Sequence, residues 1–124
     1  MEKIKIFVVD DNLAARAMLS NIISTQEDME VVGEGVSGED SMPNIAEVRP
    51  DLILLEFEVS HAIKLNGIME QIRDISPDIQ VVICAAPNAD ELVAATTESG
   101  ARDFVKKPYD RTKLFRTIRS AVFK

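Results

Sequence analysis

The chain has 124 residues, of which 46% are hydrophobic and 28% are charged. This length and composition are typical of one globular domain and argue against long disordered segments. No apolar run approaches the ~20 residues of a membrane-spanning helix. The opening MEKIKIFVVDD also lacks the longer apolar region and the cleavage site of a signal peptide. We therefore expect a single domain over residues 1–124, located in the cytoplasm.

The formal net charge is −7, and it is unevenly distributed. Residues 102–124 contain eight basic and two acidic residues, so this segment carries +6 and residues 1–101 carry −13. A net acidic chain is a poor general binder of nucleic acid, so we expect no nucleic-acid partner. The basic C-terminal segment is either a solvated face or a local docking face. The single cysteine, Cys84, lies in an apolar run and is expected in the core.

Apolar, β-branched runs alternate with segments of helical spacing along the chain. In chain order the predicted elements are strand Ile4–Val9, helix Leu13–Ile23, strand Glu30–Gly33, helix Ser41–Val48, strand Leu52–Phe57, helix Asn66–Ile75, strand Ile79–Cys84, helix Asn88–Ser99, strand Arg102–Lys106 and helix Asp110–Phe123. Pro43 fits only the first turn of its helix, because an interior proline removes a hydrogen bond and clashes with the preceding turn. Asn88 and Glu91 resemble a capping box, and Gly100 stops the helix that they begin.

This alternation predicts an α/β fold built on a five-stranded parallel sheet. The first, third and fourth strands are apolar on consecutive residues, as expected for strands that are covered on both faces. Right-handed crossover connections then place helices on both faces of the sheet.

Charged side chains follow the strands of this sheet at the places where ligands bind in open α/β folds. Asp10 and Asp11 follow the first strand, Glu56 ends the third, and Lys107 follows the fifth. Three carboxylates repel one another unless a cation or an ammonium group compensates their charge. Carboxylate oxygens suit Mg²⁺, and a lysine beside them suits a phosphoryl oxygen.

Seven motifs occur in order along nearly the whole chain, from Lys3 to about Val122. They are FVVDDN, Arg16-x-x-Leu19, VVGEGVSGED, RPDLILLE, Asn66–Gly67, SPDIQVVICAA and GARDFVKKPY. In this order and spacing they resemble the receiver domain of bacterial response regulators, which has the CheY-like, flavodoxin-like fold. The resemblance implies the strand order 2-1-3-4-5.

The resemblance also implies roles for individual residues. Asp10 and Asp11 match the acidic pair that holds Mg²⁺, with Glu56 and the backbone carbonyl of Glu58 completing a weak metal site. Lys107 matches the lysine that contacts the phosphoryl group, and its peptide bond to Pro108 matches one that is usually cis.

Two further positions match elements of the family's switch. Phe104 matches the aromatic residue whose rotamer reports activation. Ala85 stands where the family has a threonine or serine that contacts the phosphoryl group.

Three departures from the family pattern bear on phosphorylation. The phosphoacceptor position holds Glu56, whose extra methylene displaces the carboxylate by more than ~1 Å, and in-line attack tolerates little displacement. Ala85 has no hydroxyl to bond a phosphoryl oxygen. Val59 and Ser60 replace the usual Met-Pro pair, and Gly67 comes eleven residues after Glu56, which predicts a loop about three residues longer.

These departures favour a stand-alone signalling module that acts by protein–protein interaction without normal aspartate phosphorylation. A phosphorylatable regulator that uses Glu56 or Asp11 is the alternative within the family. A phosphatase-like enzyme with an aspartate nucleophile is disfavoured, because no other general base is placed at a strand end, so we expect no enzyme. Glu56 either reaches Lys107 and imitates a phosphorylated aspartate, or forms a salt bridge without functional consequence.

The resemblance implies an output face over about residues 88–124, which we expect to bind a signalling partner. Two copies could pair this face reciprocally, because the helix 88–99 brings acids and the last helix brings arginines. The sequence from Gly33 to Gly38 spells G-x-G-x-x-G, but a dinucleotide site is disfavoured because the motif follows the second strand and three acids surround it.

Overall fold

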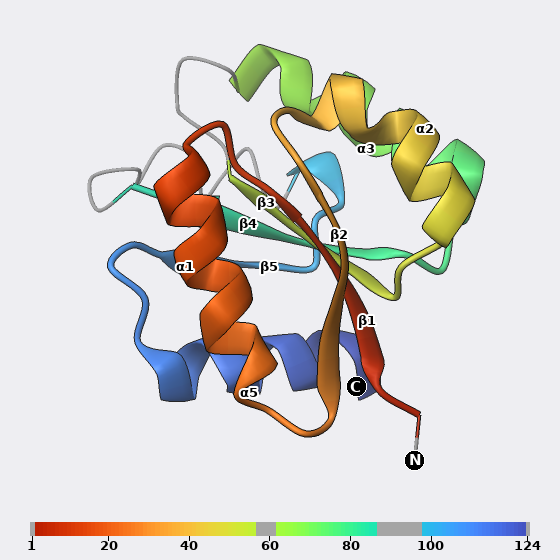
Figure 1. The fold of residues 1–124 in the computed structure, drawn as a ribbon. Coiled ribbons are helices and arrows are strands. Elements are labelled where there is room, and N and C mark those ends of the chain that lie inside the picture. Colours follow the sequence, from red (N-terminus) through yellow and green to blue (C-terminus); the bar gives the residue numbers. More distant parts are fainter. Residues whose placement is uncertain (1, 57–61, 87–97, 124) are drawn as a thin grey trace.

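The computed structural model describes residues 2–56, 62–86 and 98–123 of the chain (Figure 1). Their elements are β1 Ile4–Val9, α1 Leu13–Ser24, β2 Met29–Gly35, α2 Gly38–Val48, β3 Leu52–Glu56, α3 Ala62–Ile75, β4 Gln80–Ala85, β5 Asp103–Lys106 and α5 Arg111–Phe123. The strands form one parallel sheet in the order β2-β1-β3-β4-β5. The predicted fold class and strand order are confirmed. Most of the helix predicted over 88–99 lies outside the described residues.

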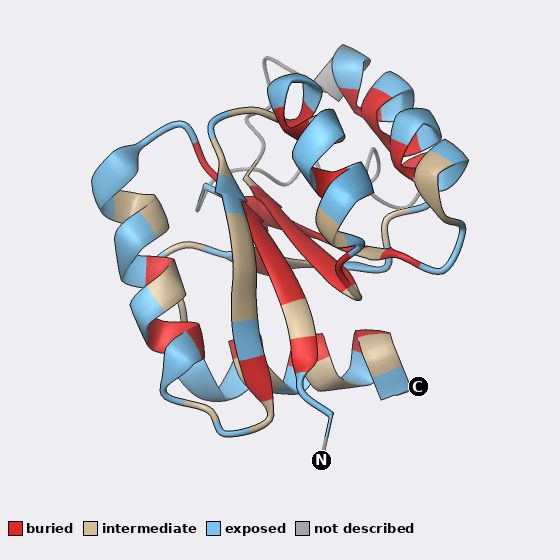
Figure 2. Cartoon of the chain, turned by 45° about the vertical axis from the view of Figure 1, so that its right-hand side comes forward, coloured by how far each residue is buried: buried red, intermediate tan, exposed pale blue. Residues whose placement is uncertain are grey.

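Helices cover both faces of the sheet, and each face has its own apolar core. Neighbouring strand residues point to opposite faces, so Phe7 packs under α2 and α3 whereas Val8 packs under α1 and α5. The central strands β1, β3 and β4 are buried almost throughout, as Figure 2 shows. Their continuous apolar runs are therefore explained by burial on both sides.

The second strand and the helix after it differ from the sequence prediction. β2 runs from Met29 to Gly35, so it continues beyond the predicted end at Gly33. α2 begins at Gly38 instead of residue 41, because the side chain of Ser37 accepts a hydrogen bond from the backbone N–H of Asp40 and caps the helix. Pro43 consequently lies in the second turn of α2, and the prediction that it occupies the first turn was wrong.

The glycines of the G-x-G-x-x-G motif are required by packing within the fold. A Cβ atom on Gly33 would collide with the ring of Phe7, and one on Gly35 would collide with the hydroxyl of Ser41. Both glycines lie in β2 and let the side chains beneath them approach the backbone closely. This explains the motif without a nucleotide.

The start of α3 also corrects the sequence prediction. The helix begins at Ala62, so Asn66 and Gly67 lie inside it and do not precede it. The predicted start at Asn66 was therefore four residues too late, and residues 57–61 connect β3 to α3. Leu65 and Ile68 pack into the core beneath α3, and this burial outweighs the weak helix propensity of Asn66 and Gly67. Among the described helices, none has the length and apolarity to cross a bilayer.

Candidate functional site

The turn after β1 fixes the first acid of the site. Asp10 is 2% exposed, its Oδ1 accepts a hydrogen bond from the backbone N–H of Asn12 at 2.9 Å, and its own N–H donates to the carbonyl of Gly35 at 3.1 Å. The side chain of Asn12 caps α1 by accepting from the backbone N–H of Ala15 at 2.9 Å. The buried carboxylate is thereby held at the carboxyl end of the sheet.

Lys107 lies between two acids that come from different strands. Its Nζ is 3.0 Å from Oδ2 of Asp10 and 4.0 Å from Oε1 of Glu56. Its backbone N–H donates to the carbonyl of Ala85 at 2.8 Å, and its peptide bond to Pro108 is cis. The expected ion pair with Glu56 is present, but the closer partner of the ammonium is Asp10.

The acids at the strand ends form a compact cluster. One carboxylate oxygen each from Asp10, Asp11 and Glu56 lies within 4.8 Å of the other two. Asp10 is buried, Glu56 is half-buried and Asp11 is exposed, so the cluster opens to solvent on one side. Three converging oxygen donors with one open side fit a hard cation such as Mg²⁺, which keeps several of its waters. Glu58, whose carbonyl was the expected fourth ligand, lies outside the described residues.

The two switch positions lie on neighbouring strands beside this cluster. Ala85 ends β4 and is 3% exposed. It has a methyl group at the position where the family has a hydroxyl. Phe104 pairs with Ile83 in the register of β5 and β4 and is half-buried against the core under α3. The predicted positions therefore share one edge of the sheet.

Arg16 is a site residue whose role the sequence did not reveal. Its Nη1 donates to the backbone carbonyl of Asp10 at 2.6 Å, and its Nε lies 3.3 Å from Oε1 of Glu34. The guanidinium thereby ties α1 to the ends of β1 and β2. Arg16 belonged to a motif, but no spacing rule connects it to Glu34, which lies eighteen positions on.

Cys84 and Tyr109 lie beneath the site on the side of α5. Cys84 is 1% exposed, and burial raises the pKa of its thiol to about 12. Burial also raises the pKa of the Tyr109 hydroxyl, with the neighbouring Cys84 adding to the effect. The prediction that Cys84 is a core residue is confirmed, and both groups are neutral at physiological pH.

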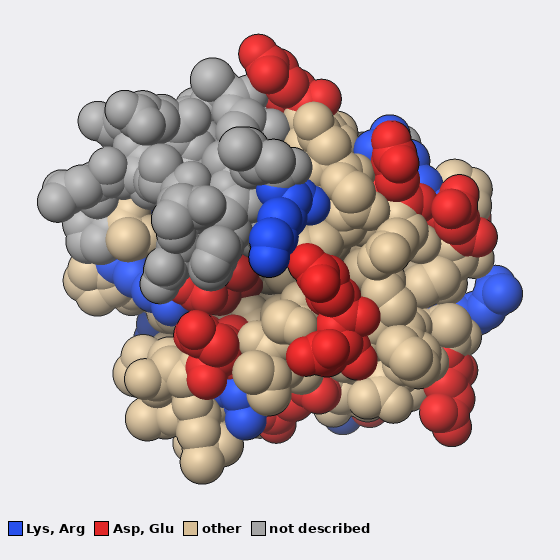
Figure 3. All heavy atoms as spheres, turned by 90° about the horizontal axis from the view of Figure 1, so that it is seen from above, with Lys and Arg blue, Asp and Glu red and all other residues tan. Residues whose placement is uncertain are grey.

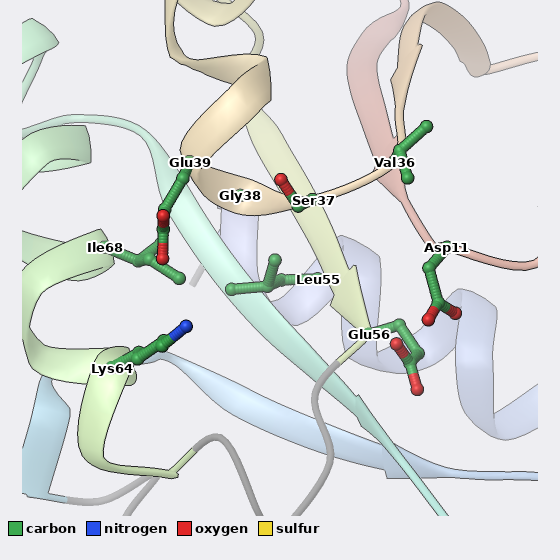
Figure 4. A pocket seen from close by; sticks show the side chains of 9 residues that line it. All are labelled: Asp11, Val36, Ser37, Gly38, Glu39, Leu55, Glu56, Lys64 and Ile68. Atoms are coloured by element: carbon green, nitrogen blue, oxygen red, sulfur yellow. The ribbon is translucent and has the colours of Figure 1, made fainter.

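A pocket of about 140 Å³ adjoins the acid cluster between β3, the start of α2 and α3 (Figure 4). Its lining residues are Asp11, Val36, Ser37, Gly38, Glu39, Leu55, Glu56, Lys64 and Ile68. Seen from above, acidic side chains gather around the middle of this edge of the molecule (Figure 3). Lys64 could not be predicted as a lining residue, because its position in the fold depends on where α3 begins.

Comparison with known proteins places these features in one family. Residues 6–119 match the family described as the response regulator receiver domain. The chain is 28% identical to the chemotaxis protein CheY of Thermotoga maritima over 116 residues, which cover 92% of this chain and 93% of that protein. It is 34% identical to the response regulator VraR of Staphylococcus epidermidis over 94% of this chain. The match spans only 55% of VraR, about half of its length.

Solved structures agree with the sequence relatives. The response regulator domain of CheB from Thermotoga maritima superposes with a TM-score of 0.81 at 26% identity, covering 99% of this chain and 98% of that chain. The receiver domain of NarL from Mycobacterium tuberculosis gives a TM-score of 0.85 at 22% identity, with the same coverage of both chains, and supports the fold. Receiver domains are in general signalling modules that interact with partner proteins and bind Mg²⁺ at an acidic site. The chain belongs to the response regulator receiver domain family.

Proposed function

We propose that this chain is a receiver-like module of a two-component or chemotaxis-type pathway that acts without normal aspartate phosphorylation. The observation that carries the proposal is the position of Glu56. It ends β3 beside Asp10 and Asp11, with Oε1 4.0 Å from the ammonium of Lys107. A carboxylate one methylene longer than aspartate is thus present at the position that matches the family's phosphoacceptor.

Two changes act together against phosphoryl transfer. The longer side chain of Glu56 moves the attacking oxygen, and a displacement of ~1 Å can slow an in-line reaction by roughly 100-fold. Ala85 leaves no hydroxyl to bond a phosphoryl oxygen at the end of β4. One of these changes alone would slow the reaction, whereas both together remove a correctly placed nucleophile and a stabilising donor.

A bound Mg²⁺ remains part of the proposal. Asp10, Asp11 and Glu56 would hold it weakly, since Oδ2 of Asp10 already bonds the ammonium of Lys107. When bound, the ion would neutralise the repulsion among the three carboxylates. The residues of the chain would only hold and orient the bound ion.

Glu56 has a second proposed role as a permanent substitute for a phosphorylated aspartate. Its carboxylate approaches Lys107, the residue that the family uses to contact the phosphoryl group. The module would then stay near its active state without a phosphoryl donor. A salt bridge without signalling consequence is the competing interpretation, and the Glu56→Gln variant separates the two by its effect on partner binding.

We propose that the partner is a signalling protein that docks on residues 88–124, which include β5 and α5. The exposed side chains of Arg111, Lys113 and Arg116 make the described part of this face basic. Of the acids expected to complement them in a homodimer, Glu98 is exposed, whereas Asp90 and Glu91 lie outside the described residues. The module would work in the cytoplasm, where such partners are found, and would carry out no reaction of its own.

Intact-mass spectrometry after incubation with acetyl phosphate and Mg²⁺ tests the proposal. We expect no phosphoryl adduct on the wild-type chain under conditions in which an ordinary receiver domain is fully phosphorylated. A stoichiometric adduct would refute the proposal, and fragmentation would then assign it to Glu56 or Asp11, the residues of the alternative regulator. Turnover of a phosphate ester without an adduct would instead indicate an enzyme.

A further inference from the structure

A groove runs between α2 and α3, next to the acid cluster. Its inner part is the pocket of about 140 Å³, and its outer part is a hollow of about 320 Å³ lined by Glu39, Lys64, Gly67, Ile68 and Gln71. Glu39, Lys64 and Ile68 line both parts, so the two are continuous. We call them together the α2–α3 groove. It lies on the face of the sheet opposite to α5.

The size of the inner pocket limits what can enter it. Its volume is about 140 Å³. Sites for drug-sized ligands and cofactors start at roughly 300 Å³. The inner pocket by itself lies below that range, so we expect it to take one long side chain.

Charged and apolar side chains occupy different parts of the wall of the inner pocket. The side chains of Leu55 and Ile68 are buried and form an apolar strip between the charged groups (Figure 4). Asp11 lies at one end, and Glu39 and Lys64 lie at the other. Among the described residues, none forms an ion pair with Lys64. An apolar strip that leads to a carboxylate matches a basic side chain, which has an apolar stem and a charged head.

Gly67 is the second, independent feature of the groove. It is the sixth residue of α3 and is exposed, and a Cβ atom there would meet nothing within 4 Å. Glycine inside a helix is destabilising relative to alanine, and no described neighbour requires it at this position. A missing side chain leaves the outer groove open for the close approach of another backbone.

We propose that the α2–α3 groove binds an extended segment of another protein, which inserts a basic side chain into the inner pocket and places a carboxylate over Lys64. The head of the basic side chain lies near Asp11, and the backbone of the segment crosses α3 at Gly67. The net charge of −7 favours the approach of a basic segment. This surface is distinct from the face of residues 88–124, and its use does not depend on phosphorylation.

A pair of synthetic peptides tests the proposal by NMR titration of the isotope-labelled full chain. The first has the order Ala-Arg-Ala-Asp-Ala with blocked ends, because residues two apart project to the same side of an extended chain. We expect saturable shifts at the backbone amides of Gly38, Gly67 and Ile68. The second peptide carries citrulline in place of arginine, which keeps the shape and removes the charge, and we expect it to bind roughly tenfold more weakly.

Protein variants separate the groove from the rest of the surface. Gly67→Leu fills the outer groove and should abolish binding while raising the melting temperature, since leucine favours a helix over glycine. Asn66→Leu, at the neighbouring exposed position outside the groove, should bind like the wild type. Lys64→Gln should weaken binding of the first peptide but not of a version with asparagine in place of aspartate.

Four results would each overturn the proposal. The first is the absence of saturable shifts at millimolar peptide, and the second is equal binding of the arginine and citrulline peptides. The third is unchanged binding by Gly67→Leu. The fourth is a shift of the Gly67 amide with protein concentration alone, which would assign the groove to a second copy of the chain.

Discussion

The ammonium of Lys107 lies 3.0 Å from Oδ2 of Asp10, a carboxylate that is almost completely buried at the end of β1. These two residues are 97 positions apart in the chain, and their contact joins the first strand to the segment after the last one. Within the described site, the lysine is therefore a structural partner of Asp10 as well as a neighbour of Glu56. Because Lys107 contacts both acids, a change in the charge of the site should also change the stability of the fold.

Replacing Lys107 with methionine should destabilise the fold by about 2 kcal/mol, because it leaves the buried carboxylate of Asp10 without its cation. The side chain of Lys107 is 28% exposed, which keeps the expected loss below that of a fully buried pair. Mg²⁺ should recover part of the loss by taking the place of the ammonium among the three acids. Urea unfolding with and without Mg²⁺ measures both effects.

The matched control for this variant is Lys113→Met, on the exposed side of α5. It removes the same charge without touching the acid cluster, so its free energy of unfolding should stay within about 0.5 kcal/mol of the wild type. Equal losses in the two variants would show that the contact with Asp10 contributes nothing specific.

Restoring aspartate at position 56 alone should recover little phosphorylation. The Glu56→Asp variant restores a nucleophile of the family's usual length but still lacks a hydroxyl at the end of β4. Adding Ala85→Ser to it should raise the rate of phosphorylation by roughly 100-fold, the usual effect of one hydrogen-bond donor on developing charge. The time course of the phosphoryl adduct by intact mass measures the two rates. Full recovery by Glu56→Asp alone would show that the methyl group of Ala85 is not an obstacle.

The strands and the acid site were predictable because they depend on local patterns. Continuous apolar runs marked the buried strands, and the acids and the lysine follow directly from where those runs end. The parallel sheet then brings these ends to one edge without further information. Glu56, Asp10 and Lys107 could therefore be placed together before any coordinates were known.

The starts of α2 and α3 were not predictable in the same way. The predicted helices began at Ser41 and Asn66, whereas the structure begins α2 at Gly38 and α3 at Ala62. In α2 the cap by Ser37 decides the start, and in α3 the burial of Leu65 and Ile68 does. The α2–α3 groove depends on these two starts, so it could not be predicted from sequence patterns.

Arg119 and Asp28 should make the stability of the fold depend on pH in the acidic range. The guanidinium donates two hydrogen bonds of 2.9 Å to the carboxylate and lowers the pKa of Asp28. Because this pKa is lower in the folded state, the contact stabilises the fold above the unfolded pKa of about 3.9 and is lost as the pH falls through the lowered value.

The Arg119→Met variant tests this pH dependence. Both side chains are partly exposed, so we expect a loss of only about 0.5–1 kcal/mol at pH 7 that disappears as the pH falls through the lowered pKa of Asp28. Denaturant unfolding of the variant and the wild type across this pH range measures the difference. Arg116→Met, which removes an exposed charge from the same helix, should show no such convergence. A loss for Arg119→Met that stays constant down to pH 2 would refute the role of Asp28.

Gly35 should be the least replaceable of the glycines near the site, because its missing Cβ makes room for Ser41. The hydroxyl of Ser41 donates to the backbone carbonyl of Ser37 at 2.6 Å in the first turn of α2, and a Cβ on Gly35 would collide with that hydroxyl. The Gly35→Ala variant must displace the hydroxyl of Ser41 and disturb the hydrogen bond that it donates, so we expect a loss of about 1–3 kcal/mol in denaturant unfolding. The same change at Gly67 should instead stabilise the fold by about 1 kcal/mol, since its Cβ meets open space within a helix. Opposite signs for one identical substitution would show that the space around Gly35 is needed by Ser41, and a gain for Gly35→Ala would contradict it.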